Sequence, residues 1–351
     1  MTPPVNGAAE AAMTKEDLIQ LVRRLAKERN TVILAHNYQD GAVQDAADFT
    51  GDSLKLAQYA RNTQASTILF CGVHFMAETA AILCPDKKVV VPDLAAGCSL
   101  ADMVMPGQVR KWKKDHPYGV AVCYVNTSAA VKAECDYCCT SSNAMQIVQA
   151  IPEEKEVLFV PDFYLGSYIK AKTGRKITLW KGFCPSHAVI NPDEIDRLRD
   201  QNPDAEFLMH PECGCLTKQM DLADQILSTD GMIQYAKMSP ARRFIIATDN
   251  GILYRLRKEN PEKTFIAASE NATCHHMQRN TIEKVARSLM TGQYEVTVDP
   301  VIARRAYACI ERMLAITEKR EPRLPADMEQ EPAQMIQLYD DWILEAANDF
   351  R

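Results

Sequence analysis

The feature that most constrains the fold of this chain is an internal repeat of about 88 residues. Three apolar, β-branched segments that end in polar residues are TVILAHNYQD (31–40), GVAVCYVNTSA (119–129) and AEFLMHPEC (205–213). A hydroxyl-bearing motif that opens a helix follows each segment, and its Ser53, Ser141 and Thr229 are spaced 88 residues apart. Repetition at a fixed period predicts three copies of one structural unit.

Each copy continues with two further strand-like segments. The second segments are STILFCG (66–72), EVLFVPD (156–162) and RFIIATD (243–249). The third segments are KVVVPD (88–93), KITLW (176–180) and KTFIAA (263–268). Strands that alternate with helices form parallel sheets with right-handed connections. The sequence therefore predicts an α/β fold, in which three pseudo-threefold-related αβα repeats with parallel sheets surround a central active site.

The repeat also predicts how the chain is divided. The expected parts are an N-terminal tail and helix (1–30), a first α/β repeat (31–115), a second (116–202), a third (203–290), and a C-terminal helical segment with an extension (291–351). Within the extension, the apolar spacing of PAQMIQLYDDWILEAANDF predicts an amphipathic helix. We expect this helix to pack on the enzyme or on a second subunit.

Charge and apolar content exclude several classes of function. The net charge of −6 argues against nucleic acid or an anionic membrane as the main partner, since both require a basic surface. No apolar run approaches the roughly 18 residues of a membrane span. The N-terminus lacks the basic and apolar regions of a secretory signal. We therefore expect a cytoplasmic protein whose twelve cysteines form no disulfides.

A cysteine follows the third segment of every copy, namely Cys98, Cys184 and Cys274. Parallel sheets bind ligands at the carboxyl ends of their strands, so three related units would bring these thiols to one site. Three thiolates can hold zinc or an iron–sulfur cluster. Cysteines from separate units, outside any CxxC pair, favour a cuboidal four-iron cluster. An iron without a protein ligand would act as a Lewis acid, which suits a dehydration.

Other cysteines have a simpler interpretation. Cys71, Cys123 and Cys309 are expected to be small buried residues of strands. The CDYCC segment (135–139) has no second metal-type pair nearby in the sequence, so we expect neither a metal site nor a redox pair there. Cys213, which follows His-Pro-Glu at a strand end, is the nearest alternative ligand for the metal.

Polar side chains at the ends of the first strands are candidates for acid–base chemistry. They are His36, Tyr38, Tyr124, Asn126, His210 and Glu212. His210 and Glu212 can serve as acid and base, with His36 and Tyr38 as further proton-transfer groups.

The three repeated hydroxyl residues have two interpretations. Ser53, Ser141 and Thr229 can cap the helices that they open. They can also bind phosphate or carboxylate, which the free N–H groups and the dipole of a helix N-terminus favour. Three such sites facing one cavity would suit substrates that carry a phosphate and carboxylates.

Two other classes of protein share this fold argument. One is a zinc-dependent α/β lyase that uses the same three cysteines. The other is a non-enzymatic protein that binds a small dianion. Iron content and visible absorption would separate both from an iron–sulfur enzyme.

These motifs resemble those of the quinolinate synthase family. The matching motifs, from about residue 20 to 315, are AHNYQ, GDSL, GVHFMAETA, AAGCSLADM, YVNTSAAVKA, TSSNA, VPDFYLG, GFCPSH, HPEC, STDGM, ATDNGILY and ENATC. The resemblance implies a 4Fe-4S cluster on Cys98, Cys184 and Cys274. It implies that iminoaspartate and dihydroxyacetone phosphate condense to quinolinate, with loss of phosphate and two waters. It also implies a partner that supplies iminoaspartate, an aspartate oxidase or dehydrogenase.

The resemblance also implies a set of active-site residues. Carried over motif by motif, they are His36, Tyr38, Ser53, Tyr124, Asn126, Ser141, His187, His210, Glu212 and Thr229. His187 enters through this resemblance alone. The chain departs from the family after Cys274, where His275 and His276 replace the usual Pro-Asn, and we expect these histidines at the surface or behind the site.

Overall fold

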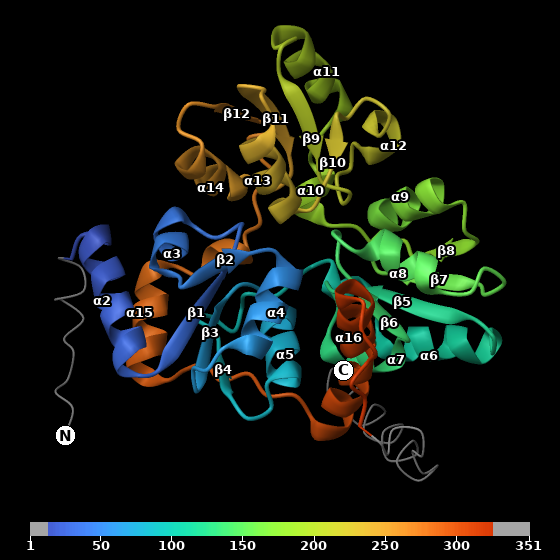
Figure 1. Cartoon of the computed structure of the whole chain (residues 1–351), viewed down its shortest axis with the longest axis horizontal. Coiled ribbons are helices and arrows are strands. Elements are labelled where there is room, and N and C mark those ends of the chain that lie inside the picture. The colour runs from blue at the N-terminus through green and yellow to red at the C-terminus, as the bar shows by residue number, and fades with distance from the viewer. Residues whose placement is uncertain (1–12, 326–351) are drawn as a thin grey trace.

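The computed structural model describes residues 13–325, which form three lobes around a common centre (Figure 1). Each lobe is built on one sheet of four parallel strands. The N-terminal tail (1–12) and the amphipathic helix expected within 326–351 lie outside the described residues. The three sheets confirm the expected α/β fold of three αβα repeats.

The three sheets share one strand order, β2-β1-β3-β4, β6-β5-β7-β8 and β10-β9-β11-β12. The strands of the first sheet are β1 (Thr31–His36), β2 (Phe49–Gly51), β3 (Thr67–Cys71) and β4 (Lys88–Val90). Those of the second are β5 (Val120–Tyr124), β6 (Tyr137–Cys139), β7 (Val157–Val160) and β8 (Ile177–Leu179). Those of the third are β9 (Glu206–Met209), β10 (Gln225–Ile226), β11 (Arg243–Ala247) and β12 (Thr264–Ala267). The identical order shows that one topology occurs three times.

Each sheet contains a short edge strand that the sequence analysis did not predict. These strands, β2, β6 and β10, pair with the first strand of their unit. The aspartate directly before each one, Asp48, Asp136 or Asp224, accepts a hydrogen bond from a backbone N–H of that first strand at 2.7–2.8 Å. The sequences of these strands, FTG, YCC and QI, contain at most one β-branched residue each, whereas the equally short β4 and β8 contain two. The three aspartates are themselves spaced 88 residues apart and are a further mark of the repeat.

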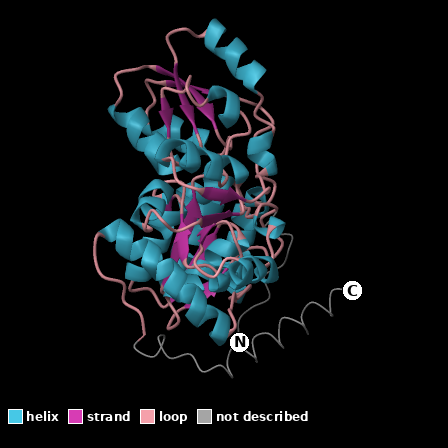
Figure 2. Cartoon of the chain, turned by 90° about the vertical axis from the view of Figure 1, so that its right-hand side faces the viewer, coloured by secondary structure: helices cyan, strands magenta, loops and turns pink. Residues whose placement is uncertain are grey.

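Helices surround the strands of each lobe (Figure 2). From the N-terminus to the second sheet they are α2 (Lys15–Glu28), α3 (Gly41–Ala46), α4 (Ser53–Asn62), α5 (His74–Leu83), the 3-10 helix η1 (Ala101–Met103) and α6 (Pro106–Asp115). The next are α7 (Ala129–Glu134), α8 (Ala144–Ala150), α9 (Phe163–Thr173), α10 (Pro185–Ala188) and α11 (Pro192–Gln201). The last are α12 (Leu216–Gln219), α13 (Thr229–Met238), α14 (Ile252–Glu259), the 3-10 helix η2 (Met277–Arg279), α15 (Ile282–Thr291) and α16 (Pro300–Glu318). Within residues 13–325, no helix has the length and apolar character needed to cross a membrane.

The last two helices return to the first two units. Helix α15 packs against α2 beside the first sheet, and Val22 and Val285 are fully buried in the apolar cluster that they share. Helix α16 packs against α7 and β6 of the second unit. The C-terminal part of the described chain therefore covers units that lie far before it in the sequence. The residue boundaries of the repeats given above stay a prediction.

The cysteines expected in the core are buried. Cys71 in β3 and Cys123 in β5 are fully buried, as is Cys309. The strand location expected for Cys309 is wrong, because this residue lies in helix α16. The return of α16 onto the second unit places the Cys309 Sγ 3.7 Å from the Cys123 Sγ. Cys135 and Cys138 also lie beside Cys123, so the second unit contains a cluster of buried thiols.

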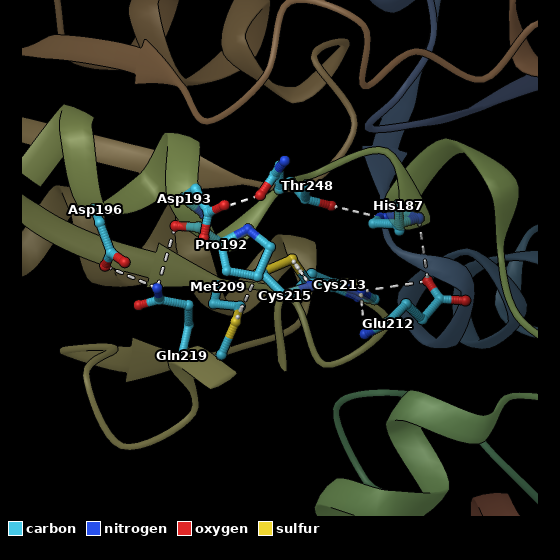
Figure 3. The surroundings of a disulfide bond; sticks show 12 residues. His187, Pro192, Asp193, Asp196, Met209, Glu212, Cys213, Cys215, Gln219 and Thr248 are labelled. Atoms are coloured by element: carbon cyan, nitrogen blue, oxygen red, sulfur yellow. Dashed lines mark hydrogen bonds and ion pairs between the residues drawn. A yellow bond between two sulfur atoms is a disulfide. The ribbon is translucent and has the colours of Figure 1, made fainter. Parts of the chain in front are cut away.

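One pair contradicts the expectation that the cysteines form no disulfides. Cys213 and Cys215, in the turn that follows β9, are joined by a disulfide (Figure 3). The turn brings their Cα atoms to 5.2 Å, within the usual range for a disulfide. Both residues are fully buried in the apolar core of the third unit. This pairing also leaves Cys213 without a free thiol for the metal site.

Candidate active site

All predicted site residues line one cavity at the meeting point of the three units. They are His36, Tyr38, Ser53, Cys98, Tyr124, Asn126, Ser141, Cys184, His187, His210, Glu212, Thr229 and Cys274. Apolar side chains, including Phe75 and Met277, complete the wall. The structure therefore brings together residues from the whole length of the described chain, while their individual roles stay predictions.

The three cavity cysteines lie in equivalent loops. Cys98, Cys184 and Cys274 follow the fourth strand of the first, second and third sheet, and each is only partly buried as a residue. The Cys98 and Cys274 thiols lie close enough to Cys184 for their charges to raise its pKa. The three sulfurs are therefore neighbours, and three thiolates can hold zinc or an iron–sulfur cluster.

The thiols of these cysteines are set in a low-polarity environment. Burial raises the pKa of the Cys98 thiol to about 12, and it also raises the pKa of Cys184 and Cys274. Thiolates at this site therefore require a positive partner, and metal binding deprotonates its ligands in this way. Asp249 supports one of the loops, because its Oδ2 accepts a hydrogen bond of 2.5 Å from the backbone N–H of Cys274.

His210 and Glu212 form a buried acid–base pair in the cavity. The His210 Nδ1 and the Glu212 Oε2 are 3.3 Å apart, and both residues are 3% exposed. Asn126 donates a hydrogen bond of 3.4 Å to the other carboxylate oxygen of Glu212, and the His210 Nε2 lies 3.1 Å from the Ser141 Oγ. The two side chains meet as expected, although Glu212 lies in a turn and not in an extended segment.

Burial changes the proton affinity of this pair in opposite directions. It raises the pKa of the Glu212 carboxyl well above its usual range, and the nearby charge of Asp162 adds to this effect. It lowers the pKa of His210 well below its usual range, and the charges of His187 and His36 add to that effect. The site can therefore hold a carboxyl group beside a neutral imidazole, and these two groups can exchange protons with a bound molecule.

A second hydrogen-bonded group contains one residue from each of the three units. The Tyr38 hydroxyl lies 2.5 Å from the Thr248 Oγ1 and 3.3 Å from the His187 Nε2. The His187 Nε2 is also 2.9 Å from the Thr248 Oγ1. Burial lowers the pKa of His187 to about 4 and that of His36 to about 3. Sequence reasoning missed Thr248, although its place directly after β11 resembles that of the predicted residues.

The repeated hydroxyl residues are not the caps of their helices. Asp52 caps α4 and Ser228 caps α13, so Ser53 and Thr229 are the first helical residues. Ser141 precedes the cap residue of α8, which is Asn143. Capping therefore does not account for the three hydroxyls. The Thr229 Oγ1 accepts a hydrogen bond of 2.9 Å from Asn37, and all three residues line the cavity.

One further set of residues could interact with a metal, because ligand atoms of His187, His210 and Glu212 all lie within 4.8 Å of one another. Of the two histidines after Cys274, His275 is exposed, as expected for a surface residue. His276 is partly buried, and its Nε2 lies 3.1 Å from the Ser99 Oγ.

Comparison with known proteins gives a consistent match. The family model described as quinolinate synthetase A protein matches residues 20–315. A quinolinate synthase of Pyrobaculum aerophilum is 53% identical over 307 residues, which cover 86% of this chain and 99% of the relative. Quinolinate synthases of Thermus thermophilus and Dehalococcoides mccartyi are 50% and 48% identical, over 87% of this chain and 99% and 100% of the relatives. The chain therefore belongs to the quinolinate synthetase A protein family.

Proposed function

We propose that this enzyme condenses iminoaspartate with dihydroxyacetone phosphate to quinolinate, with loss of phosphate and two waters. The proposal includes a 4Fe-4S cluster held by Cys98, Cys184 and Cys274. The observation that carries it is the convergence of one cysteine from each repeat on a cavity with buried acid–base groups. A protein that only binds a dianion would not need three thiols at that point.

The donor set fits the cluster. Three cysteine ligands leave one iron of a cuboidal cluster for substrate, and that iron supplies Lewis-acid polarisation of an oxygen when the cluster is bound. The match to the quinolinate synthetase A protein family argues against the alternative of a zinc-dependent lyase that uses the same cysteines.

We assign proton transfer to the cavity side chains. In its ionised form, Glu212 acts as the base that removes a carbon-bound proton, and its raised pKa makes that form more basic. His210 orients the carboxyl group from 3.3 Å. We assign to Tyr38 the transfer of a proton to a leaving hydroxyl. We also assign His36 to proton transfer, because the centroids of the His36 and Tyr38 rings are 4.6 Å apart.

We assign substrate binding to the remaining polar residues. Ser53 and Thr229 lie in the first turn of α4 and α13, where free backbone N–H groups favour a phosphate or carboxylate. The second unit adds Ser141, Tyr124 and Asn126, which line the same cavity. We also assign His187 to substrate binding, since its Nδ1 is 3.1 Å from the Cys184 Sγ and its ring centroid is 5.3 Å from that of His210. The set would hold a phosphate and two carboxylates.

The reaction also implies a setting in the cell. Iminoaspartate must come from an enzyme that oxidises aspartate, so an aspartate oxidase or dehydrogenase is the proposed partner. A cytoplasmic location is proposed because thiolate ligands require a reducing compartment. Ten cysteines are free thiols, which supports that location.

Anaerobic purification followed by metal analysis tests the proposal. We expect about four iron and four sulfide per chain, with a broad visible absorption band. The same preparation should form quinolinate from dihydroxyacetone phosphate and enzymatically generated iminoaspartate. Stoichiometric zinc without iron, in a protein that turns over these substrates, would contradict the cluster. An iron-loaded protein without turnover would contradict the reaction.

A further inference from the structure

The fold does not require a hydroxyl group at the position of Thr248. It directly follows β11, and the residues that directly follow the equivalent strands β3 and β7 are Gly72 and Pro161. The same topology therefore forms with no side-chain oxygen at this point in two of the three units. Thr248 is nevertheless 1% exposed, and burial of a hydroxyl is unfavourable unless it is hydrogen-bonded.

The hydroxyl of Thr248 joins two groups of the active site. Its Oγ1 lies 2.5 Å from the Tyr38 hydroxyl and 2.9 Å from the His187 Nε2. Figure 3 shows Thr248 and His187 pointing toward each other, joined by a dashed line. Tyr38 is 210 residues away in the sequence and His187 is 61. The Tyr38 hydroxyl also lies 3.3 Å from the His187 Nε2, so Thr248 is the nearer of its two hydrogen-bond partners.

The connection continues to a cluster cysteine. The His187 Nδ1 lies 3.1 Å from the Cys184 Sγ, so hydrogen-bond distances run from Cys184 through His187 and Thr248 to the Tyr38 hydroxyl. A threonine hydroxyl has one hydrogen, so it donates to only one neighbour and must accept from the other. The orientation of the Tyr38 O–H is therefore linked to which nitrogen of His187 carries a hydrogen.

We propose that Thr248 is a positioning residue, which fixes the direction of the Tyr38 hydroxyl for proton transfer through its bond to His187. This inference rests on the proposed function, because it gives Tyr38 the role of proton donor. Thr248 itself need not touch the substrate. A hydroxyl at this position, in threonine or serine, is sufficient for the role, and a methyl group of equal size is not.

The test compares three variants of the cluster-loaded enzyme. Thr248→Val removes the hydroxyl and keeps the volume, and Thr248→Ser keeps the hydroxyl. The matched control is Thr79→Val, because the buried Thr79 hydroxyl donates only to the backbone oxygen of Phe75, at 2.8 Å. We expect kcat of Thr248→Val to fall about tenfold to a hundredfold, with KM within about twofold, since the change affects positioning. Thr248→Ser and Thr79→Val should retain most of the activity.

A second measurement does not depend on turnover. In the cluster-free protein labelled with ¹⁵N-histidine, Thr248→Val should shift the ring-nitrogen signals of His187, assigned by their loss in His187→Asn, and Thr79→Val should leave them unchanged. Full kcat in Thr248→Val, a loss confined to KM, equal loss in Thr248→Ser, or unshifted His187 signals would each overturn the inference. Absence of quinolinate formation by the unsubstituted enzyme would instead overturn the proposed function, and the histidine spectra would still test the contact.

Discussion

Two groups of cysteines in this molecule have different surroundings. Cys123, Cys135, Cys138 and Cys309 lie close together within the second unit and belong to its apolar core. The cavity cysteines come one from each unit and lie beside buried histidines, a glutamate and tyrosines. In the first group, two sulfurs are only 3.7 Å apart. Closeness of thiols is therefore not what distinguishes a candidate metal site in this fold.

The difference follows from where each cysteine lies relative to its sheet. Cys123 and Cys138 lie inside strands, where side chains pack against neighbouring elements. The cavity cysteines lie in loops after the fourth strands, at the carboxyl ends of parallel sheets, where ligands bind. These three loops leave their sulfurs facing a shared cavity, whereas the strand positions of Cys123 and Cys138 place theirs in the core.

The largest expected effect separates the two groups directly. Replacement of Cys98, Cys184 or Cys274 by alanine should abolish iron retention, visible absorption and turnover, because each removes a cluster ligand. Cys123→Ala and Cys309→Ala should keep all three properties. If either core variant loses its iron, or if a cavity variant keeps all of its iron, the two groups of cysteines do not differ in the proposed way.

The second prediction separates residues that hold the cluster from those that move protons. Glu212→Gln keeps the size of the side chain but removes the base, so turnover should fall by about a hundredfold or more. Iron content and quinolinate affinity should stay close to those of the unsubstituted enzyme. Steady-state kinetics and calorimetry measure these quantities. Near-normal turnover would move the base role to His36, Tyr38 or His210.

The third prediction concerns the hydroxyls on the cavity wall. Ser141→Ala or Thr229→Ala should weaken quinolinate binding by about tenfold to a hundredfold, since each removes a hydrogen bond to a charged group. The visible spectrum should not change. Ser142→Ala is the matched control, because Ser142 bonds Thr140 and is exposed. Equal affinities in all three variants, measured by calorimetry, would remove the hydroxyls from the binding surface.

The smallest expected effect is on the free energy of unfolding. Here the substitution in the apolar core should have the larger effect, whereas the substitution at the cavity has the larger effect on iron binding. In the cluster-free protein, Cys309→Ala should lower the free energy of unfolding by about 1–3 kcal/mol, because it leaves a gap in a packed core. Cys98→Ala should lower it by less than about 1 kcal/mol, since Cys98 is partly exposed and faces the cavity. Urea unfolding gives both values. A larger loss for Cys98→Ala would show that the cavity thiols also stabilise the fold.

Much of the fold could be predicted because its signals are local. The 88-residue spacing and the apolar segments were sufficient for nine of the twelve strands within residues 13–325, for three similar units and for the loops that carry the three cavity cysteines. The strands β2, β6 and β10 were missed because each contains at most one β-branched residue. The motifs likewise predicted which residues line the cavity, and the structure places all of them there.

The sequence by itself thus determined the repeat, the parallel sheets and the positions of the candidate ligands, because strand pattern and spacing depend on neighbouring residues. Only the tertiary structure decided which side chains touch across units. It joined Thr248 to Tyr38 and Cys309 to Cys123. Within single units, it also paired Cys213 with Cys215 and made Asp52 and Ser228 the helix caps instead of Ser53 and Thr229. These contacts depend on how a helix returns, a turn closes or two lobes approach, and local patterns of polarity do not encode those distances.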